Sequence, residues 1–273
     1  MSSQEIHGLV IFAVLSVPLL SLTAAIFGDR VPFVRLRRPR DPQEPPLWGW
    51  AEIIMVIGCW CFFLLFASRA VVPLVTSGVV GDALGVVIIQ TVATAMTGVV
   101  IYVLLRRLFG QPWTSVGFVP TGGSNLVTAL VLWLITLIPI QALYLIWNLI
   151  LRLFFGHETV PQELVKIYET CVENRDWVAV GLFMVSGVIV APLAEEVIFR
   201  GVFYGPLRLR WGILVGATVS SGVFAVAHWS ASAFLPLFAL GCLLCYLRER
   251  TGSLYPAMVF HAVFNGATFL VHL

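Results

Sequence analysis

The sequence predicts an all-α fold, a polytopic membrane helix bundle with about eight transmembrane helices. Of its 273 residues, 59% are apolar and 11% are charged, whereas about 25% are charged in a soluble globular protein. The mean hydropathy of +0.97 agrees with this assignment. At ~20 residues per span, eight spans leave room for short loops but not for a separate soluble domain. An ordinary cytosolic enzyme is excluded, and a net charge of +2 without a basic patch excludes a nucleic-acid partner.

Each predicted span is an apolar run longer than a buried globular helix needs. The runs cover residues 8–27, 48–68, 83–105, 125–151, 177–199, 211–229, 232–247 and 253–273. No basic residue precedes the first run, so we expect a retained span and not a signal peptide. The two short runs between Trp211 and Leu247 are joined by a Trp-Ser-Ala-Ser turn, and they are alternatively a helical hairpin that does not cross the membrane completely.

The distribution of basic residues predicts the orientation of the bundle. Five arginines follow the first run, and the positive-inside rule puts that loop in the cytoplasm and the N-terminus outside. Alternation then gives eleven basic residues on the cytoplasmic side and four on the other side, where acidic residues cluster between residues 158 and 176. We therefore expect a multi-pass integral membrane protein, in the plasma membrane if the source is prokaryotic. No repeat or linker divides the chain, so residues 1–273 are expected to form a single membrane domain.

Two further patterns concern packing. Gly212, Gly216 and Ser220 are spaced by four in the sixth run, which predicts close approach of a neighbouring helix. Four of the five cysteines lie inside apolar runs, and Cys171 alone lies in a polar stretch. No disulfide framework follows from this distribution.

Ionisable side chains inside the apolar runs identify the candidate site, because burying one in a bilayer costs at least ~2.5 kcal/mol. They occur in three segments, each of which also has a helical spacing of four between partner residues. The residues are Glu195, Glu196 and Arg200 in the first segment, Phe224 and His228 in the second, and His261 and Asn265 in the third.

Helical spacing predicts how these side chains pair. Glu196 precedes Arg200 by four residues, which is the favourable order for an ion pair. Glu195 points ~100° away from Glu196, so Arg200 cannot neutralise both carboxylates and Glu195 is left for another role. Counting along ideal helices puts Glu195 and His261 ~15–20 Å from the cytoplasmic charges and His228 ~25 Å from them. His228 is thus expected to need a tilted helix or a protruding loop to reach the others.

The three motifs, Glu-Glu-x-x-x-Arg, Phe-x-x-x-His and His-x-x-x-Asn, resemble the CAAX protease and bacteriocin-processing family of intramembrane endopeptidases, relatives of the type II CAAX prenyl endopeptidase. The resemblance covers residues 177–273, and the first four runs match nothing beyond hydrophobicity. It implies hydrolysis of a peptide bond by a water that Glu195 and His228 activate. It further implies that His261 and Asn265 stabilise the oxyanion. We expect no cofactor.

Elementary chemistry is compatible with those roles. A carboxylate in a low-dielectric cavity is a stronger base, and a neighbouring histidine can share its proton. Donors fixed on one helical face can point toward a developing negative charge. Glu196 and Arg200 are expected to support the site as an ion pair, and Phe224 as an apolar wall beside His228.

Three other interpretations remain open. Two histidines and a glutamate are a ligand set of catalytic zinc, although the His-Glu-x-x-His spacing is absent. A non-catalytic member of the family, with an immunity, chaperone or scaffold role, could lose Glu195 or Asn265, and this chain retains both. A transporter is disfavoured because charges in the first four runs are confined to Glu52, Arg69 and Asp82 near their ends. The expected partners are the lipid bilayer and a protein or peptide substrate, prenylated or not.

Overall fold

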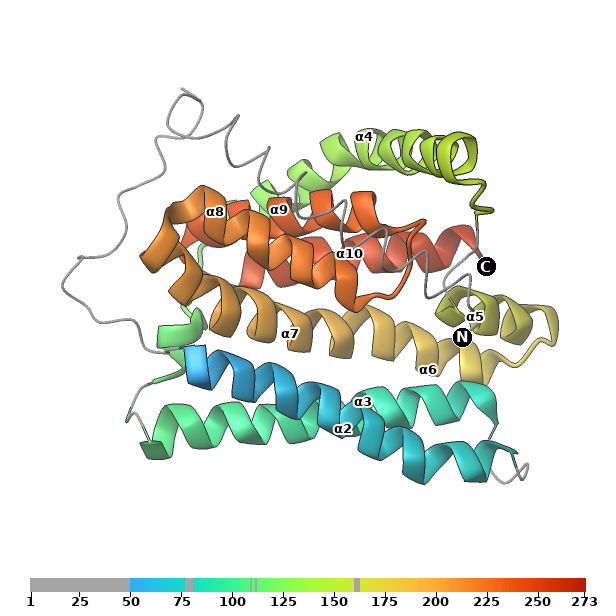
Figure 1. Cartoon of the computed structure of the whole chain (residues 1–273), viewed down its shortest axis with the longest axis horizontal. Coiled ribbons are helices and arrows are strands. Elements are labelled where there is room, and N and C mark those ends of the chain that lie inside the picture. The colour runs from blue at the N-terminus through green and yellow to red at the C-terminus, as the bar shows by residue number, and fades with distance from the viewer. Residues whose placement is uncertain (1–49, 77–80, 109, 111, 160–162) are drawn as a thin grey trace.

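The computed structural model describes residues 50–76, 81–108, 110, 112–159 and 163–273. Within these ranges all regular elements are helices, which confirms the predicted all-α membrane bundle (Figure 1). The predicted first span, residues 8–27, and the arginine-rich loop after it lie outside the described residues.

The helices form layers on either side of a central helical run (Figure 1). Helices α2, Trp50–Thr76, and α3, Asp82–Tyr102, are an antiparallel pair on one side. Helix α4, Gly123–Phe155, lies on the opposite side and packs against α9, Phe234–Thr251, and α10, Tyr255–Val271. The segments that carry the ionisable residues of the candidate site therefore lie between two apolar layers.

Residues 177–227 form five consecutive helical segments, and the last of them, α8, reverses direction at Gly212. They are α6 (Trp177–Val185), η3 (Ser186–Val190), α7 (Ala191–Glu195), η4 (Glu196–Phe203) and α8 (Tyr204–Ala227). Segments η3 and η4 have the wider π-helical turn, a form that is rare and frequent at functional sites. The short helix that ends at Glu195 is thus bounded on both sides by widened turns.

Seven predicted spans fall on observed helices. The runs 177–199 and 211–229 lie on two separate arms, as expected, because the backbone at Gly212 between them is not helical, with φ 82° and ψ 168°. One element was not predicted: the apolar-run criterion fails to detect α5, Glu163–Glu173, because this short helix is amphipathic.

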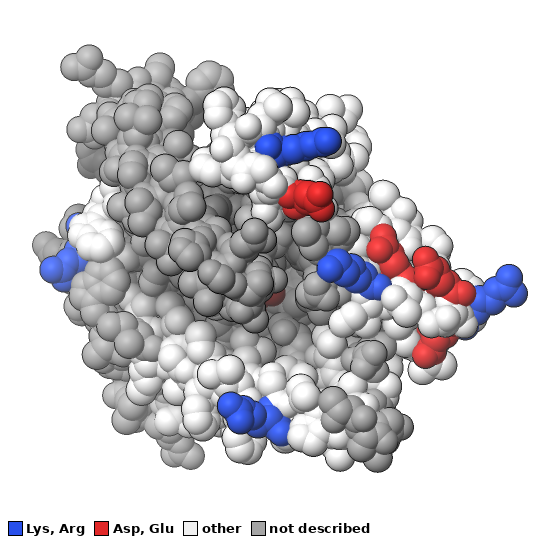
Figure 2. Space-filling model, turned by 45° about the vertical axis from the view of Figure 1, so that its right-hand side comes forward, with Lys and Arg blue, Asp and Glu red and all other residues white. Residues whose placement is uncertain are grey.

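Lengths and exposed side chains agree with a membrane environment. Four helical stretches among the described residues are long and apolar enough to cross a bilayer: Met55–Val75, Leu84–Leu105, Gly123–Phe155 and Trp177–Ala227, the last of which includes the reversal at Gly212. Large apolar side chains such as Phe62 and Leu65 on α2 and Ile138 on α4 are more than half exposed, as lipid-facing positions require. In the view of Figure 2, acidic side chains gather mainly toward one edge, and most of the described surface carries no charge.

Successive helices alternate in direction, so that their connections gather at two opposite ends (Figure 1). At one end the Leu254 N–H donates to the Gly117 carbonyl at 2.8 Å. At the other end, His272 Nδ1 lies 2.7 Å from Glu169 Oε1 on α5. If successive spans cross the membrane in alternating directions, the two segments in each contact are expected on the same side of the membrane, as observed. Which end faces the cytoplasm stays a prediction.

Candidate active site

A reversal at Gly212 brings His228 to the level of Glu195. The backbone at Gly212 has φ 82° and ψ 168°, outside the helical region and accessible mainly to glycine. Glu195 precedes Gly212 by 17 residues and His228 follows it by 16. At ~1.5 Å per residue both side chains lie ~25 Å from the reversal. Because both segments start from the same reversal, Glu195 and His228 lie at a similar depth, and the difference of several ångströms expected from the sequence disappears.

The two arms of the reversal pack closely, as the small-residue spacing predicts. A Cβ atom on Gly216 would lie 2.8 Å from the Arg208 backbone nitrogen and 2.9 Å from its Cα. Ser220 Oγ donates to the Phe199 carbonyl at 3.1 Å. Gly216 and Ser220 thus hold the second arm of α8 against the segment that carries the acidic motif.

The predicted ion pair between Glu196 and Arg200 is confirmed. Arg200 Nη1 lies 3.0 Å from Glu196 Oε1, and both side chains are 0% exposed. Arg200 Nη2 also donates to the Gly241 carbonyl at 3.4 Å, and its guanidinium carbon lies 4.4 Å from the centre of the Phe224 ring. A buried ion pair needs such additional partners to offset its desolvation. The arrangement fixes η4 against α8 and α9.

Glu196 also connects the acidic motif to α10. Its Oε1 atom lies 2.9 Å from Nδ1 of His261, whose ring is buried. Because Nδ1 is engaged there, the other ring nitrogen, Nε2, faces Glu195, with 3.8 Å between Nε2 and Oε2. Glu196 therefore orients His261 toward the second carboxylate.

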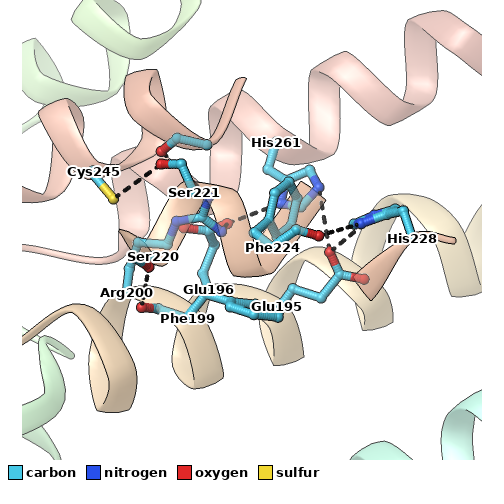
Figure 3. Close-up of polar contacts among 11 residues, drawn as sticks. Glu195, Glu196, Phe199, Arg200, Ser220, Ser221, Phe224, His228, Cys245 and His261 are labelled. Carbon is cyan, nitrogen blue, oxygen red and sulfur yellow. Dashed lines mark hydrogen bonds and ion pairs between the residues drawn. The ribbon is translucent and has the colours of Figure 1, made fainter. Parts of the chain in front are cut away.

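Glu195 lies between two imidazole rings (Figure 3). Its Oε2 is 4.0 Å from Nε2 of His228 and 3.8 Å from Nε2 of His261. His228 Nδ1 donates to the Phe224 carbonyl at 2.8 Å, since a carbonyl can only accept, and this directs Nε2 toward Glu195. Oε2 is buried without a hydrogen-bond partner among the described residues. Both separations are longer than a direct hydrogen bond and of a length that a bridging water can span.

Asn265 lies one turn beyond His261 on α10 and contacts the widened turn η3. Its Nδ2 donates to the Gly187 carbonyl at 2.9 Å. That carbonyl is available because Ala191 N–H bonds to Ser186, five residues back, and Pro192 has no N–H to offer. The structure thus brings Glu195, His228 and His261 together, while one proton of the Asn265 amide is used by the backbone.

Phe224 forms the apolar wall that the sequence predicts beside His228. The ring is fully buried and lies edge-on to His228 at 4.7 Å and to His261 at 5.7 Å between ring centres. Sequence reasoning missed the carbonyls of Gly187 and Gly241, because backbone acceptors carry no residue signature. Across the described ranges, no group of three or more His, Cys, Asp or Glu side chains has the arrangement of a metal site. The zinc hypothesis therefore rests on residue types and not on ligand geometry.

Comparison with known proteins agrees with the motifs. Residues 177–267 match the family described as type II CAAX prenyl endopeptidase Rce1-like. The chain is similar to that family over this segment, about a third of its length. All seven candidate residues lie within the Rce1-like segment, which begins at the start of α6 and includes most of α10.

Two curated relatives share part of the chain. "Putative membrane peptidase YdiL" of Bacillus subtilis is 30% identical over 93 residues, which are 34% of this chain and 37% of that protein. An uncharacterized 24.3 kDa protein of Escherichia coli is 33% identical over 85 residues, 29% of this chain and 39% of that protein. The match thus spans less than half the length of either relative. No solved structure matches the chain.

Proposed function

We propose that the protein is an intramembrane endopeptidase that hydrolyses a peptide bond of a membrane-associated protein or peptide. One observation carries the proposal: the buried Oε2 of Glu195 has no hydrogen-bond partner among the described residues and faces Nε2 of both His228 and His261 at 4.0 and 3.8 Å. A desolvated carboxylate between two imidazoles is an arrangement suited to general base catalysis. The Rce1-like match of the segment and the peptidase name of one relative support the same activity.

In this mechanism Glu195 and His228 bind a water and take up one of its protons. The resulting hydroxide attacks the carbonyl carbon of the scissile bond, and the proton then passes to the departing amine. His228 can assist because Nδ1 is held by the Phe224 carbonyl at 2.8 Å, which leaves Nε2 for the water. The partial exposure of the Glu195 and His228 side chains, 13% and 24%, is compatible with access to the bond.

His261 and Asn265 would stabilise the oxyanion that forms during attack. With a proton on each ring nitrogen, His261 donates from Nδ1 to Glu196 and from Nε2 to the oxyanion. Asn265 has a second amide proton besides the one donated to Gly187. Removing one such donor costs about 10²–10³ in kcat in other hydrolases.

The proposal is tested by comparing membranes that contain the wild type with membranes that contain Glu195→Gln. Mass spectrometry of membrane proteins should find substrates that accumulate uncut with Glu195→Gln and are cut with the wild type. Identical peptide patterns would contradict the proposal and favour the non-catalytic role. Quenched fluorescent peptides with a farnesylated and an unmodified cysteine, assayed with the wild type, then decide whether the substrate is prenylated.

The zinc-dependent alternative makes a different prediction. Without a required metal, prolonged treatment with a strong zinc chelator should leave the cleavage rate unchanged, and elemental analysis should find no stoichiometric zinc. Activity that is lost on chelation and restored by zinc would make Glu195, His228 and His261 ligands.

A further inference from the structure

Two neighbouring polar side chains on α4 contact the loop that follows His228. Trp147 Nε1 donates to the Ala231 carbonyl at 2.8 Å. Asn148 Nδ2 donates to the Ser232 carbonyl at 3.1 Å, and the Asn148 side chain is buried. Each pair is separated by 84 residues along the chain. A largely apolar helix thus directs two neighbouring hydrogen-bond donors at one short loop.

The loop, residues 229–233, needs these donors because its backbone is not helical. Ser232 and Ala233 of this loop are buried, and buried irregular backbone in a membrane protein must find its hydrogen-bond partners within the protein. Local contacts supply some of them: Phe234 N–H donates to the Ala231 carbonyl at 3.3 Å, and Ala233 N–H donates to Ser230 Oγ at 3.3 Å. The side chains of α4 add long-range partners for the Ala231 and Ser232 carbonyls.

Trp229 shows that the loop is held in an unusual conformation. Helices α4 and α9 end in the left-handed region with glycines, Gly156 at φ 62° and Gly252 at φ 67°. Helix α8 is followed in the same region by a bulky residue, Trp229, at φ 51°. A conformation of this kind persists only when the surroundings hold it in place. The two hydrogen bonds from α4 to the Ala231 and Ser232 carbonyls help to hold the loop, and with it Trp229, in this conformation.

His228 is the residue directly before this loop, so the loop determines where its ring lies. The ring direction is set locally by the Phe224 carbonyl, but the distance of 4.0 Å to Glu195 depends on where the end of α8 is held. We propose that Trp147 and Asn148 are positioning residues that fix loop 229–233 and, through it, the placement of His228 beside Glu195. The catalytic consequence rests on the proposed function. The proposal also gives a role to α4, which lies outside the Rce1-like segment.

The test uses Trp147→Phe, which removes the indole N–H and keeps an aromatic ring. Trp133→Phe is the matched control, because Trp133 lies on the same helix and its buried Nε1 has no hydrogen-bond partner among the described residues. The full chain is purified in lipid nanodiscs, with a quenched peptide that the wild type cleaves as the probe. We expect Trp147→Phe to lower kcat about tenfold, as small displacements of catalytic groups do, with KM changed less than about twofold. The control should match the wild type.

Hydrogen–deuterium exchange gives a second readout that does not need activity. Amides of residues 229–234 should exchange faster in Trp147→Phe than in Trp133→Phe, with the rest of α8 and α9 unchanged, and adding Asn148→Leu should enlarge the difference. Equal kcat and equal exchange in the two tryptophan variants would overturn the proposal. So would a uniform rise in exchange with a lower Tm, which indicates general loss of packing. If the wild type cleaves no peptide, the proposed function fails, and the exchange comparison alone decides the positioning role.

Discussion

The helices before and after residue 160 differ in the polar groups that they bury. In the described part of α2 to α4, the buried polar side chains are those of Thr97 and Asn148. From α6 onward the buried polar side chains are Ser186, Glu196, Arg200, Thr218, Ser220, Ser221, Ser232, Ser253 and His261. Buried polar side chains are thus concentrated in the carboxyl-terminal region, and the amino-terminal helices contribute mainly apolar surface.

The two regions also use their hydroxyl and amide groups differently. On α2 and α3, Ser68 and Thr97 donate to carbonyls of their own helices, four residues back. In the carboxyl-terminal region Ser220 and Asn265 donate to other segments, at 3.1 and 2.9 Å. Within lipid such bonds between helices resist separation more than apolar contact alone. The comparison indicates that polar contacts between segments hold the site region, whereas α2 and α3 rely on apolar packing and α4 adds the donors Trp147 and Asn148.

The largest effect that would sharpen this comparison is on turnover. Glu195→Gln should lower the cleavage rate by about 10²–10⁴-fold, the usual contribution of a general base, while the thermal midpoint stays within a few degrees. Glu158→Gln, an acid in the exposed segment after α4, is the control and should cleave at the wild-type rate. Near-normal turnover in Glu195→Gln would remove Glu195 from the mechanism.

The next effect is on stability and concerns the buried ion pair. Glu196→Gln or Arg200→Met should each destabilise the protein by ~3–5 kcal/mol, because each leaves an unpaired buried charge. The double variant should recover part of this loss, and not all, since Glu196 also bonds to His261 at 2.9 Å. Unfolding by denaturant in detergent measures the coupling. If the double-mutant cycle shows no coupling energy between Glu196 and Arg200, and the variants lose turnover but not stability, Glu196 takes part directly in catalysis.

Local sequence patterns predicted the contacts within one helix of the site better than the way separate helices meet around it. The four-residue spacing of Glu196 and Arg200 was sufficient to predict their contact, because both residues lie on one helical face. The meeting of Glu195 with His228 depended on the reversal at Gly212, and a glycine among small residues is read equally well as a packing position. Apolar runs located seven spans, yet they could not show that the chain reverses at Gly212 between two of them.

Contacts made by backbone groups were beyond the reach of sequence reasoning. The Gly187 carbonyl accepts from Asn265 because a widened turn and a proline leave it free, and the widened turn is not visible in residue types alone. Asn148 could have been noticed as an amide inside an apolar run, since such amides often bond across helices. Its partner loop could not have been identified, because the contact spans 84 residues.

A third experiment compares glycines in the two regions. Gly216→Ala should destabilise the protein by ~1–3 kcal/mol through overpacking, since its Cβ would lie 2.8 Å from the Arg208 backbone nitrogen. Gly98→Ala on α3 should be neutral or stabilising by up to ~1 kcal/mol, because no atom lies within 4 Å of its Cβ position. Denaturant midpoints of the two variants provide the measurement. Equal losses at both positions would contradict the difference in packing between the regions.

The smallest effect concerns the two non-glycine residues in the described ranges with positive φ, Arg175 at 56° and Trp229 at 51°. Arg175 lies in the exposed turn between α5 and α6, and Trp229 follows His228. Glycine at either position relieves strain of ~1–2 kcal/mol and loses part of that gain to chain entropy. Both Arg175→Gly and Trp229→Gly should therefore raise stability by ~0.5–1 kcal/mol.

The two glycine variants should differ in catalysis. Arg175→Gly should leave kcat unchanged, because its turn makes no contact with the site. Trp229→Gly should lower kcat by a few fold although it stabilises the fold, because a more flexible residue after His228 widens the range of positions that the imidazole samples beside Glu195. Stability from denaturant unfolding and kcat from the same preparations provide the comparison. A gain in stability with a loss of kcat at Trp229 but not at Arg175 would show that the strained conformation of Trp229 serves the site. A loss of stability at both positions would mean that neither residue is strained.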